Sequence, residues 1–145
     1  MIRAVDSDRL FIGDAISARD LRQLYDLELT AVVDLAANEL PAQLGRDLVY
    51  CRFPLHDDGS NSEHLIRSAL DCITSLIHNA HRTLVACSAG MSRSPVLAAA
   101  AISLLSREPL DAVLTRIVAD SPHDVSPALF SSVASIHATL MDAPA

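Results

Sequence analysis

The chain has 145 residues, which is the size of one ordinary domain and enough to bury a sizeable hydrophobic core. Hydrophobic residues make up 50% and charged residues 20%, a composition typical of globular proteins. The formal net charge is −7 and there is no lysine. This charge argues against nucleic acids and anionic membranes as partners, because both select an excess of Lys and Arg. We therefore expect a single domain over residues 1–145, with no nucleic-acid or membrane partner.

The lack of a recognisable targeting or membrane-spanning segment, together with the cysteine usage, indicates a cytoplasmic protein. The longest apolar stretch, at 96–105, is too short to span a membrane. Residues 1–8 lack the basic start and apolar run of a signal peptide. Cys51, Cys72 and Cys87 form an odd set without paired spacing, so reduced thiols are expected. We expect a cytoplasmic protein, and a monomer as its oligomeric state.

Short apolar runs alternate with helical patterns in the first half of the chain. The elements predicted there, in chain order, are a strand at 10–14, a helix with Ser17 as N-cap, a buried strand at 30–35, a turn or short helix near 39–45, and a strand at 48–53 that ends at Pro54.

The second half opens with a polar, turn-rich segment at 54–61. The elements predicted after it are an amphipathic helix at 65–77, a buried strand at 83–87, a helix with Pro95 in its first turn, a helix at 110–119, and a helix at 127–141 with Ser126 as N-cap. Strands that alternate with helices predict an α/β fold, with a mostly parallel sheet covered by helices on both faces. Ligands of such sheets bind outside the carboxyl ends of the strands, where the polar loops after Phe53 and Ala86 both begin.

The most informative segment is a Cys-x5-Arg-Ser string between the strand at 83–87 and the next helix. It runs Cys87, Ser88, Ala89, Gly90, Met91, Ser92, Arg93, Ser94. Small residues and a glycine allow the backbone to curl so that successive N–H groups face inward and form an anion-binding nest. The helix that follows adds the positive end of its dipole. The planar guanidinium of Arg93 matches two phosphate oxygens.

The same electropositive surroundings act on the thiol at the head of the loop. Helix N-termini and nearby cations favour the thiolate form of a cysteine. We therefore expect Cys87 to be a thiolate at neutral pH, ready to attack phosphorus. Ser94 is expected to donate a hydrogen bond to this thiolate. The loop predicts a phosphate-binding site formed by residues 88–93.

The string Ala-Cys-Ser-Ala-Gly-Met-Ser-Arg-Ser-Pro at 86–95 resembles the signature of the dual-specificity-type, cysteine-dependent protein phosphatases. The resemblance extends over nearly the whole chain, because segments 10–14, 30–35 and 53–57 are similar to the family's opening strand and to the two stretches before its signature. It implies a five-stranded α/β domain. One position departs from the family pattern, because Ala86 stands where the family usually has a His that supports the loop.

Expelling an alkoxide or phenolate requires a proton donor, and activating the hydrolytic water requires a base. The resemblance places an aspartate with both roles on the loop after the preceding strand, in a Pro-x-x-Asp setting. The sequence Pro54-Leu-His-Asp57 fits this pattern and nominates Asp57, with the adjacent Asp58 as the fallback. The mechanism needs no metal or cofactor.

The function predicted from these residues is a protein phosphatase that acts on phosphotyrosine, with phosphoserine and phosphothreonine as further candidates. Its substrate would be a phosphoprotein or a small phosphomonoester. Two other functions remain open. One is sulfur transfer or arsenate reduction by a Cys-led anion loop, and the other is a non-catalytic module that binds phosphopeptides. The segment 121–124 could border the cleft, and Cys51 or Cys72 could protect Cys87 by forming a reversible disulfide.

Overall fold

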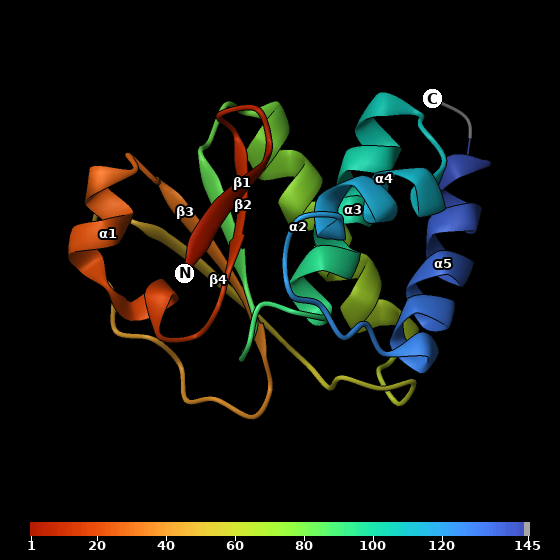
Figure 1. Cartoon of the computed structure of the whole chain (residues 1–145), viewed down its shortest axis with the longest axis horizontal. Coiled ribbons are helices and arrows are strands. Elements are labelled where there is room, and N and C mark those ends of the chain that lie inside the picture. The colour runs from red at the N-terminus through yellow and green to blue at the C-terminus, as the bar shows by residue number, and fades with distance from the viewer. Residues whose placement is uncertain (144–145) are drawn as a thin grey trace.

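The computed structural model describes residues 1–143, which build an α/β fold around one five-stranded sheet (Figure 1). The strands are β1 (Ile2–Asp6), β2 (Leu10–Gly13), β3 (Ala31–Ala36), β4 (Val49–Leu55) and β5 (Thr83–Ala86). The helices are the 3-10 helix η1 (Ser17–Arg19) and the α-helices α1 (Leu21–Asp26), α2 (Glu63–His78), α3 (Arg93–Ser106), α4 (Leu110–Val118) and α5 (Pro127–Met141).

The strand order is β1-β2-β5-β3-β4. β2, β5, β3 and β4 run parallel, and β1 alone pairs antiparallel with β2. The predicted mostly parallel sheet is therefore confirmed. Because β3, β4 and β5 run in one direction, the loops that follow them leave the same edge of the sheet.

Helices cover both faces of the sheet, as predicted. α1 lies on one side in Figure 1, and α2 to α5 lie on the other. The larger core cluster lies under α2 to α5, where α3 is buried from Arg93 to Ser103. The smaller cluster lies on the other face, where Leu24 of α1 packs with Phe11, Val32 and Leu84 of the sheet.

The helix expected to begin at Ser17 is divided in two, so this prediction is wrong. Ser17 opens the short helix η1, and α1 begins four residues later with Asp20 as its N-cap. The Asp20 side chain accepts a hydrogen bond from the backbone N–H of Gln23, at 3.2 Å. Ser17 is buried, and its hydroxyl accepts a hydrogen bond from the amino group of Met1 at 2.6 Å. Its side chain is therefore engaged elsewhere and does not cap a helix.

The strand expected to end at Pro54 continues to Leu55, so this boundary is also wrong. β4 is an edge strand that pairs only with β3 within the described sheet. A proline without an N–H is tolerated on the open side of an edge strand. The segment 39–45 contains no helix; a turn at 37–39 follows β3 instead.

β1 was not predicted from residue patterns. Its sequence Ile-Arg-Ala-Val-Asp carries two charges, and none of its residues is fully buried. It pairs with β2 from Ile2 opposite Gly13 to Asp6 opposite Leu10. An edge strand of this kind lacks the continuous apolar run that identified the central strands. No helix within residues 1–143 has the length and apolar character needed to cross a membrane.

Candidate active site

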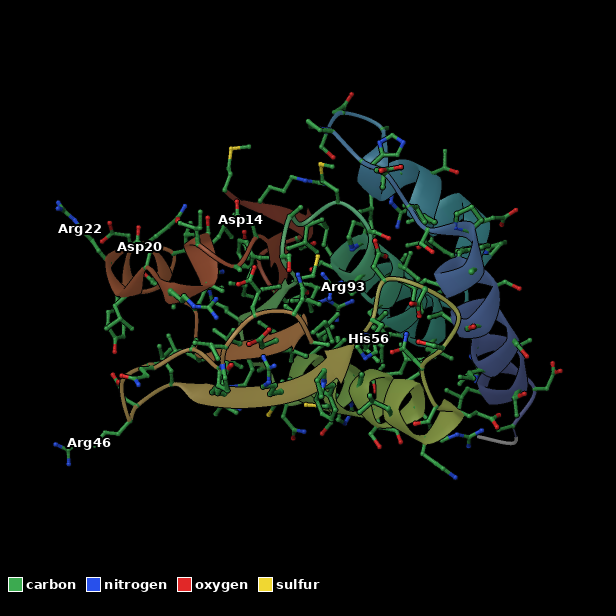
Figure 2. All side chains as sticks on the ribbon, turned by 90° about the horizontal axis from the view of Figure 1, so that it is seen from below. Asp14, Asp20, Arg22, Arg46, His56 and Arg93 are labelled. Atoms are coloured by element: carbon green, nitrogen blue, oxygen red, sulfur yellow. The ribbon has the colours of Figure 1, made fainter. Side chains whose placement is uncertain are left out.

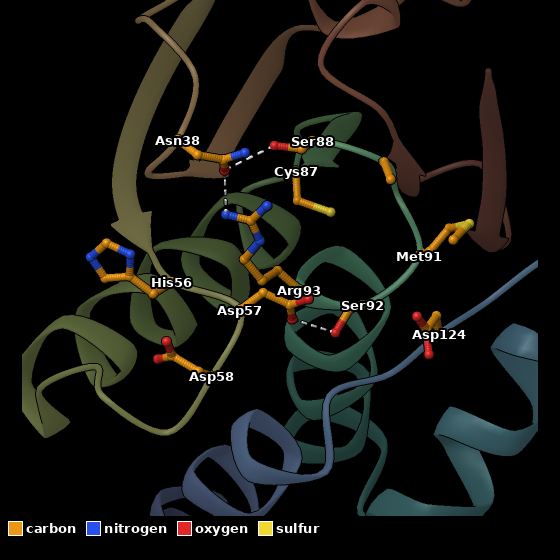
Figure 3. Close-up of a pocket in the computed structure, with 11 residues that line it drawn as sticks. Asn38, His56, Asp57, Asp58, Cys87, Ser88, Met91, Ser92, Arg93 and Asp124 are labelled. Atoms are coloured by element: carbon orange, nitrogen blue, oxygen red, sulfur yellow. Dashed lines mark hydrogen bonds between the residues drawn. The ribbon is translucent and has the colours of Figure 1, made fainter.

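The loops that follow β3, β4 and β5 enclose a pocket of about 500 Å³ (Figure 3). The residues that line it are Asn38, His56, Asp57, Asp58, Cys87, Ser88, Ala89, Met91, Ser92, Arg93 and Asp124. The pocket thus brings together the predicted nucleophile, arginine and general acid from segments that are far apart in the sequence.

The loop between β5 and α3 is curled around the Cys87 side chain. The backbone N–H of Cys87 donates to the carbonyl oxygen of Gly13 at 3.3 Å, and the N–H of Gly90 donates to Cys87 Sγ at 3.2 Å. Gly90 has a φ of +74°, and a Cβ at this position would lie 3.1 Å from the backbone of Gly13. The curl therefore requires glycine both for its left-handed backbone and for its close approach to β2. Cys87 is buried, with 2% of its surface exposed.

Arg93 is the first residue of α3 and is also buried, with 6% of its surface exposed. Its Nη1 donates to Asn38 Oδ1 at 3.0 Å and to the carbonyl oxygen of Leu55 at 2.9 Å. Both acceptors are neutral, and no ion pair within residues 1–143 includes Arg93. In Figure 2, Arg93 lies near His56 in the middle of the fold, whereas Arg22 and Arg46 extend away at its edge.

Asp57 lies at the pocket, and its position depends on Ser92. Ser92 Oγ donates to Asp57 Oδ1 at 2.6 Å and accepts from the backbone N–H of Ser126 at 2.9 Å. Ser126 is the N-cap of α5, as predicted, because its hydroxyl accepts from Leu129 N. Ser92 belongs to the loop at 87–93, here called the phosphate loop. It therefore connects this loop to the loop after β4 and to the start of α5.

Asp58 differs from its neighbour, because its carboxylate is turned toward its own loop (Figure 3). Asp58 Oδ1 accepts from the backbone N–H of Ser60 at 2.9 Å and from the Ser60 hydroxyl at 2.5 Å. These hydrogen bonds lower the pKa of Asp58. Hydrogen bonds within its own turn therefore hold Asp58, whereas a residue of the loop that begins at Cys87 holds Asp57.

Ser94 does not make the contact that was expected of it. The side chain is fully buried, and its hydroxyl has no hydrogen-bond partner among residues 1–143. The expected bond to Cys87 Sγ is therefore not formed in this structure. The curl of the loop gives Cys87 Sγ the backbone N–H of Gly90 as its donor instead.

Asn38 is a pocket residue that the sequence patterns did not predict. It lies two residues after the end of β3, and its Oδ1 accepts from Ser88 Oγ at 2.9 Å in addition to Arg93. A signal was present in the sequence, since Asn38 follows a buried strand at the carboxyl edge of the sheet. Asp124 also lines the pocket, and its N–H donates to the carbonyl oxygen of Met91 at 3.0 Å. The segment 121–124 thus borders the cleft, as suggested.

Ala86 lies buried in β5, and its methyl side chain cannot form a hydrogen bond to the loop. Backbone hydrogen bonds from the end of β2 and from the residues just after it support the loop instead. Besides the bond to Gly13, the N–H of Ala15 donates to the carbonyl oxygen of Ser88 at 3.1 Å.

Neither Cys51 nor Cys72 lines the pocket. The Cys72 side chain on α2 interacts with that of Cys51 on β4, and burial together with this neighbour raises the pKa of Cys72 to about 12. Within residues 1–143, no group of three or more His, Cys, Asp or Glu side chains is arranged to hold a metal ion.

Comparisons with known proteins give the family of the chain from its sequence and related structures from its fold. The family profile of the dual specificity phosphatase catalytic domain matches residues 10–106. Dual specificity protein phosphatase PHS1 from Arabidopsis thaliana is 35% identical over 101 residues, which are 67% of this chain and 11% of that protein. The chain therefore spans only a small part of that relative's length.

Two solved structures show the same fold. Human DUSP28 superposes with a TM-score of 0.83 at 20% identity, over 97% of each chain. A mouse putative dual specificity phosphatase complexed with zinc tungstate superposes with a TM-score of 0.84 at 19% identity, over 96% of this chain and 87% of that chain. At these identities, the likeness shows the shared fold alone.

Proposed function

Because the chain belongs to the dual specificity phosphatase family, we propose that it hydrolyses phosphate monoesters through a cysteinyl-phosphate intermediate. Its substrates would be phosphotyrosine and also phosphoserine or phosphothreonine in proteins. Cys87 is the nucleophile, Arg93 binds the phosphate together with the backbone of residues 88–92, and Asp57 is the general acid. The whole segment 1–145 would act as one phosphatase domain, as a monomer and in the cytoplasm.

The observation that carries this proposal is the uncompensated charge of Arg93 beside the Cys87 loop. A buried guanidinium that has only neutral protein acceptors is costly unless an anion completes its surroundings. The Gly90 N–H that donates to Cys87 Sγ and the start of α3 favour negative charge at the same place. A phosphate dianion satisfies both requirements.

The reaction proceeds in two displacements on phosphorus. The Cys87 thiolate attacks phosphorus, an S–P bond forms, and the P–O bond to the leaving group breaks while Asp57 donates its proton to the departing oxygen. The resulting carboxylate of Asp57 then takes a proton from water, which attacks phosphorus and displaces the thiolate. The products are the dephosphorylated alcohol or phenol and inorganic phosphate, and Asp57 is protonated again. The Ser92 hydroxyl supports this role by holding Asp57 at the pocket.

The pocket also supports a choice among substrates. Asp57, Asp58 and Asp124 line it, and Arg93 is its only arginine among the described residues. Highly anionic substrates such as polyphosphorylated inositol lipids are therefore disfavoured, because they would meet repulsion from these carboxylates. A monoester with a single phosphate matches one guanidinium.

The two other functions have less support. A resolving cysteine near Cys87 would favour arsenate reduction or sulfur transfer, but neither Cys51 nor Cys72 lines the pocket. A non-catalytic module typically lacks the cysteine, the arginine or the aspartate, and this chain carries Cys87, Arg93 and Asp57 together.

The test is hydrolysis of p-nitrophenyl phosphate by the wild-type protein and by Cys87→Ser. Turnover is expected to disappear in Cys87→Ser while tungstate still binds, because the serine hydroxyl leaves the loop in place. Cys72→Ser is the matched control outside the pocket and is expected to keep its activity. A phosphatase rate retained in pure Cys87→Ser protein would refute the covalent mechanism.

Alkylation by iodoacetate gives an independent measurement. Cys87 is expected to react faster than Cys72, because a thiol with a pKa of about 12 is protonated at neutral pH. Phosphate is expected to protect Cys87 and to leave the slow reaction of Cys72 unchanged. Peptide mapping after partial labelling identifies the modified residue.

A further inference from the structure

We propose that Asn38 is a positioning residue, which sets the rotation of the Arg93 guanidinium so that its Nε–Nη2 edge faces the substrate phosphate. The inference rests on the proposed phosphatase function and adds a residue to the machinery of that site. Asn38 acts through Arg93 and Ser88 and takes no part in bond making.

A single atom of Asn38 connects both ends of the phosphate loop. Its side-chain oxygen accepts from Ser88 Oγ at 2.9 Å, one residue after Cys87, and from Arg93 Nη1 at 3.0 Å, where α3 begins (Figure 3). Because a guanidinium can only donate, the amide atom that faces Arg93 must be the oxygen. A change at Asn38 therefore affects the start and the end of the loop together.

The donors of Arg93 show what this contact achieves. A guanidinium has five N–H groups, of which two belong to Nη1. One Nη1 hydrogen bond goes to Asn38, and the other goes to the carbonyl oxygen of Leu55 at 2.9 Å. No hydrogen bond within residues 1–143 uses Nε or Nη2 of Arg93. These two nitrogens form the parallel pair of donors that matches two phosphate oxygens.

The segment that carries Asn38 is held in place on its far side. Arg52 Nη2 donates to the carbonyl oxygen of Glu39 at 2.9 Å, and Arg19 Nη2 donates to the carbonyl oxygen of Leu40. Arg52 is itself fixed by an ion pair with the buried Asp34, at 3.1 Å. Asn38 is exposed at the pocket, but the backbone on which it stands is anchored to the sheet and to η1.

The neutral charge of the amide matters as well as its geometry. A carboxylate in the same place would also accept from Arg93, but it would cancel part of the positive charge that a phosphate dianion needs. An amide oxygen orients the guanidinium and leaves that charge available. Asn38 thus combines an acceptor of the right reach with no competing charge.

The first experiment compares Asn38→Ala, Asn38→Asp and the matched control Asn79→Ala, which changes an asparagine at the end of α2. In Asn38→Ala, kcat for p-nitrophenyl phosphate is expected to fall about tenfold or more, which is the size expected for losing a hydrogen bond to a charged group. KM is expected to change less, because the paired Nε and Nη2 donors of Arg93, its fork, bind the phosphate most strongly in the transition state. Asn38→Asp is expected to lower tungstate affinity more than Asn38→Ala does, and Asn79→Ala is expected to match the wild type.

A double-mutant cycle separates positioning from a merely structural role. Arg93→Lys keeps the charge but removes the fork, and is expected to cost on the order of 10²-fold in kcat. If Asn38 acts through that fork, adding Asn38→Ala to Arg93→Lys should lower kcat by no more than about twofold further. Losses that multiply in the double variant, or wild-type kcat in Asn38→Ala, would overturn the inference.

Tungstate binding distinguishes failure of this inference from failure of the proposed function. In a Cys87→Ser background, which removes the reaction, adding Asn38→Ala is expected to weaken tungstate binding while Asn79→Ala does not. A wild-type protein without phosphatase activity would refute the proposed function, but weaker tungstate binding would still support the role of Asn38. Unchanged tungstate binding in Asn38→Ala would contradict it, whatever the activity.

Discussion

Asp57 and Asp58 are adjacent in the sequence, yet their side chains have different surroundings. Ser92 of the phosphate loop donates to Asp57, whereas Ser60 of the same turn donates twice to Asp58. The bonds from Ser60 lower the pKa of Asp58 and hold its carboxylate within its own turn, whereas Asp57 is held by a residue of the loop that begins at Cys87. Asp57 is therefore the better candidate for the acid.

Asp57→Asn is expected to lower kcat/KM, which reports formation of the cysteinyl phosphate, sharply for substrates with poor leaving groups such as phosphoserine. The loss should be much smaller for p-nitrophenyl phosphate, whose leaving group departs without a proton. The basic limb of the pH–rate profile should also flatten. Asp58→Asn, the matched neighbour, is expected to behave like the wild type across the leaving-group series and to keep the basic limb of the pH–rate profile. A leaving-group series at one pH provides the measurement.

Two results would contradict this assignment. If Asp58→Asn alone shows the large loss with poor leaving groups and the small loss with good ones, the acid lies one residue further along the loop. If both variants behave like the wild type, the proton comes from a different group, and the transfer of this role from the family to Asp57 is wrong.

At the scale of helices and strands, local sequence patterns were sufficient to predict an element wherever the contacts that define it are close in sequence. β5, the loop after it and the Ser126 cap could be predicted because each depends on neighbouring residues, although the strand ends at Ala86 and not at residue 87 as predicted. The Asn38–Arg93 contact spans 55 positions, and the sequence gives no direct sign of it. The extent of β4 past Pro54 likewise depends on its place at the edge of the sheet.

The serine caps of the two long helices lead to a prediction about stability. Ser62 accepts from Leu65 N at the start of α2, and Ser126 accepts from Leu129 N at the start of α5. Ser62→Ala is expected to lower the free energy of unfolding by about 1 kcal/mol, because an N–H of the first turn loses its partner. Ser126→Ala should cost about the same, because it removes the cap to Leu129 N but keeps the backbone N–H that donates to Ser92. Urea unfolding measures both.

Ser131→Ala is the matched control, because Ser131 lies within α5, has an exposed side chain and does not cap the helix. Alanine has the higher helix propensity, so this change should leave the free energy of unfolding unchanged or raise it by a few tenths of a kcal/mol. An equal loss in all three variants would show that the caps make no special contribution.

At the scale of the whole molecule, α3 connects the pocket to the packing of the C-terminal helices. Its first residue is Arg93, and Ser103 in its last turns lies against α5. His137 of α5 is buried, and its Nε2 lies 2.8 Å from Ser103 Oγ, which donates to the carbonyl oxygen of Glu108. Because the hydroxyl hydrogen is used for Glu108, His137 must donate from Nε2. Protonation at Nδ1 would place a charge in this buried interface.

The final prediction concerns the pH dependence of stability. Burial lowers the pKa of His137 below its ordinary value, so the unfolded chain binds a proton at a higher pH than the folded one does. The free energy of unfolding should therefore be highest above the unfolded pKa of about 6.5, should fall as the pH drops through it, and should level off below the folded pKa. Urea unfolding between about pH 7.5 and pH 5 covers the upper part of this window. It also stays above the pH range in which carboxylates with a lowered pKa become protonated and lose their contribution to the free energy of unfolding.

His137→Gln replaces the titrating ring with a side chain that can still donate to Ser103, so its unfolding free energy should vary less over this range than that of the wild type. His64→Gln, which changes an exposed histidine of α2, is the matched control and should keep the wild-type pH dependence. If His137→Gln shows the same pH dependence as the wild type, the loss of stability on acidification arises from other groups. If His64→Gln removes that dependence, the buried contact between α3 and α5 is not its source.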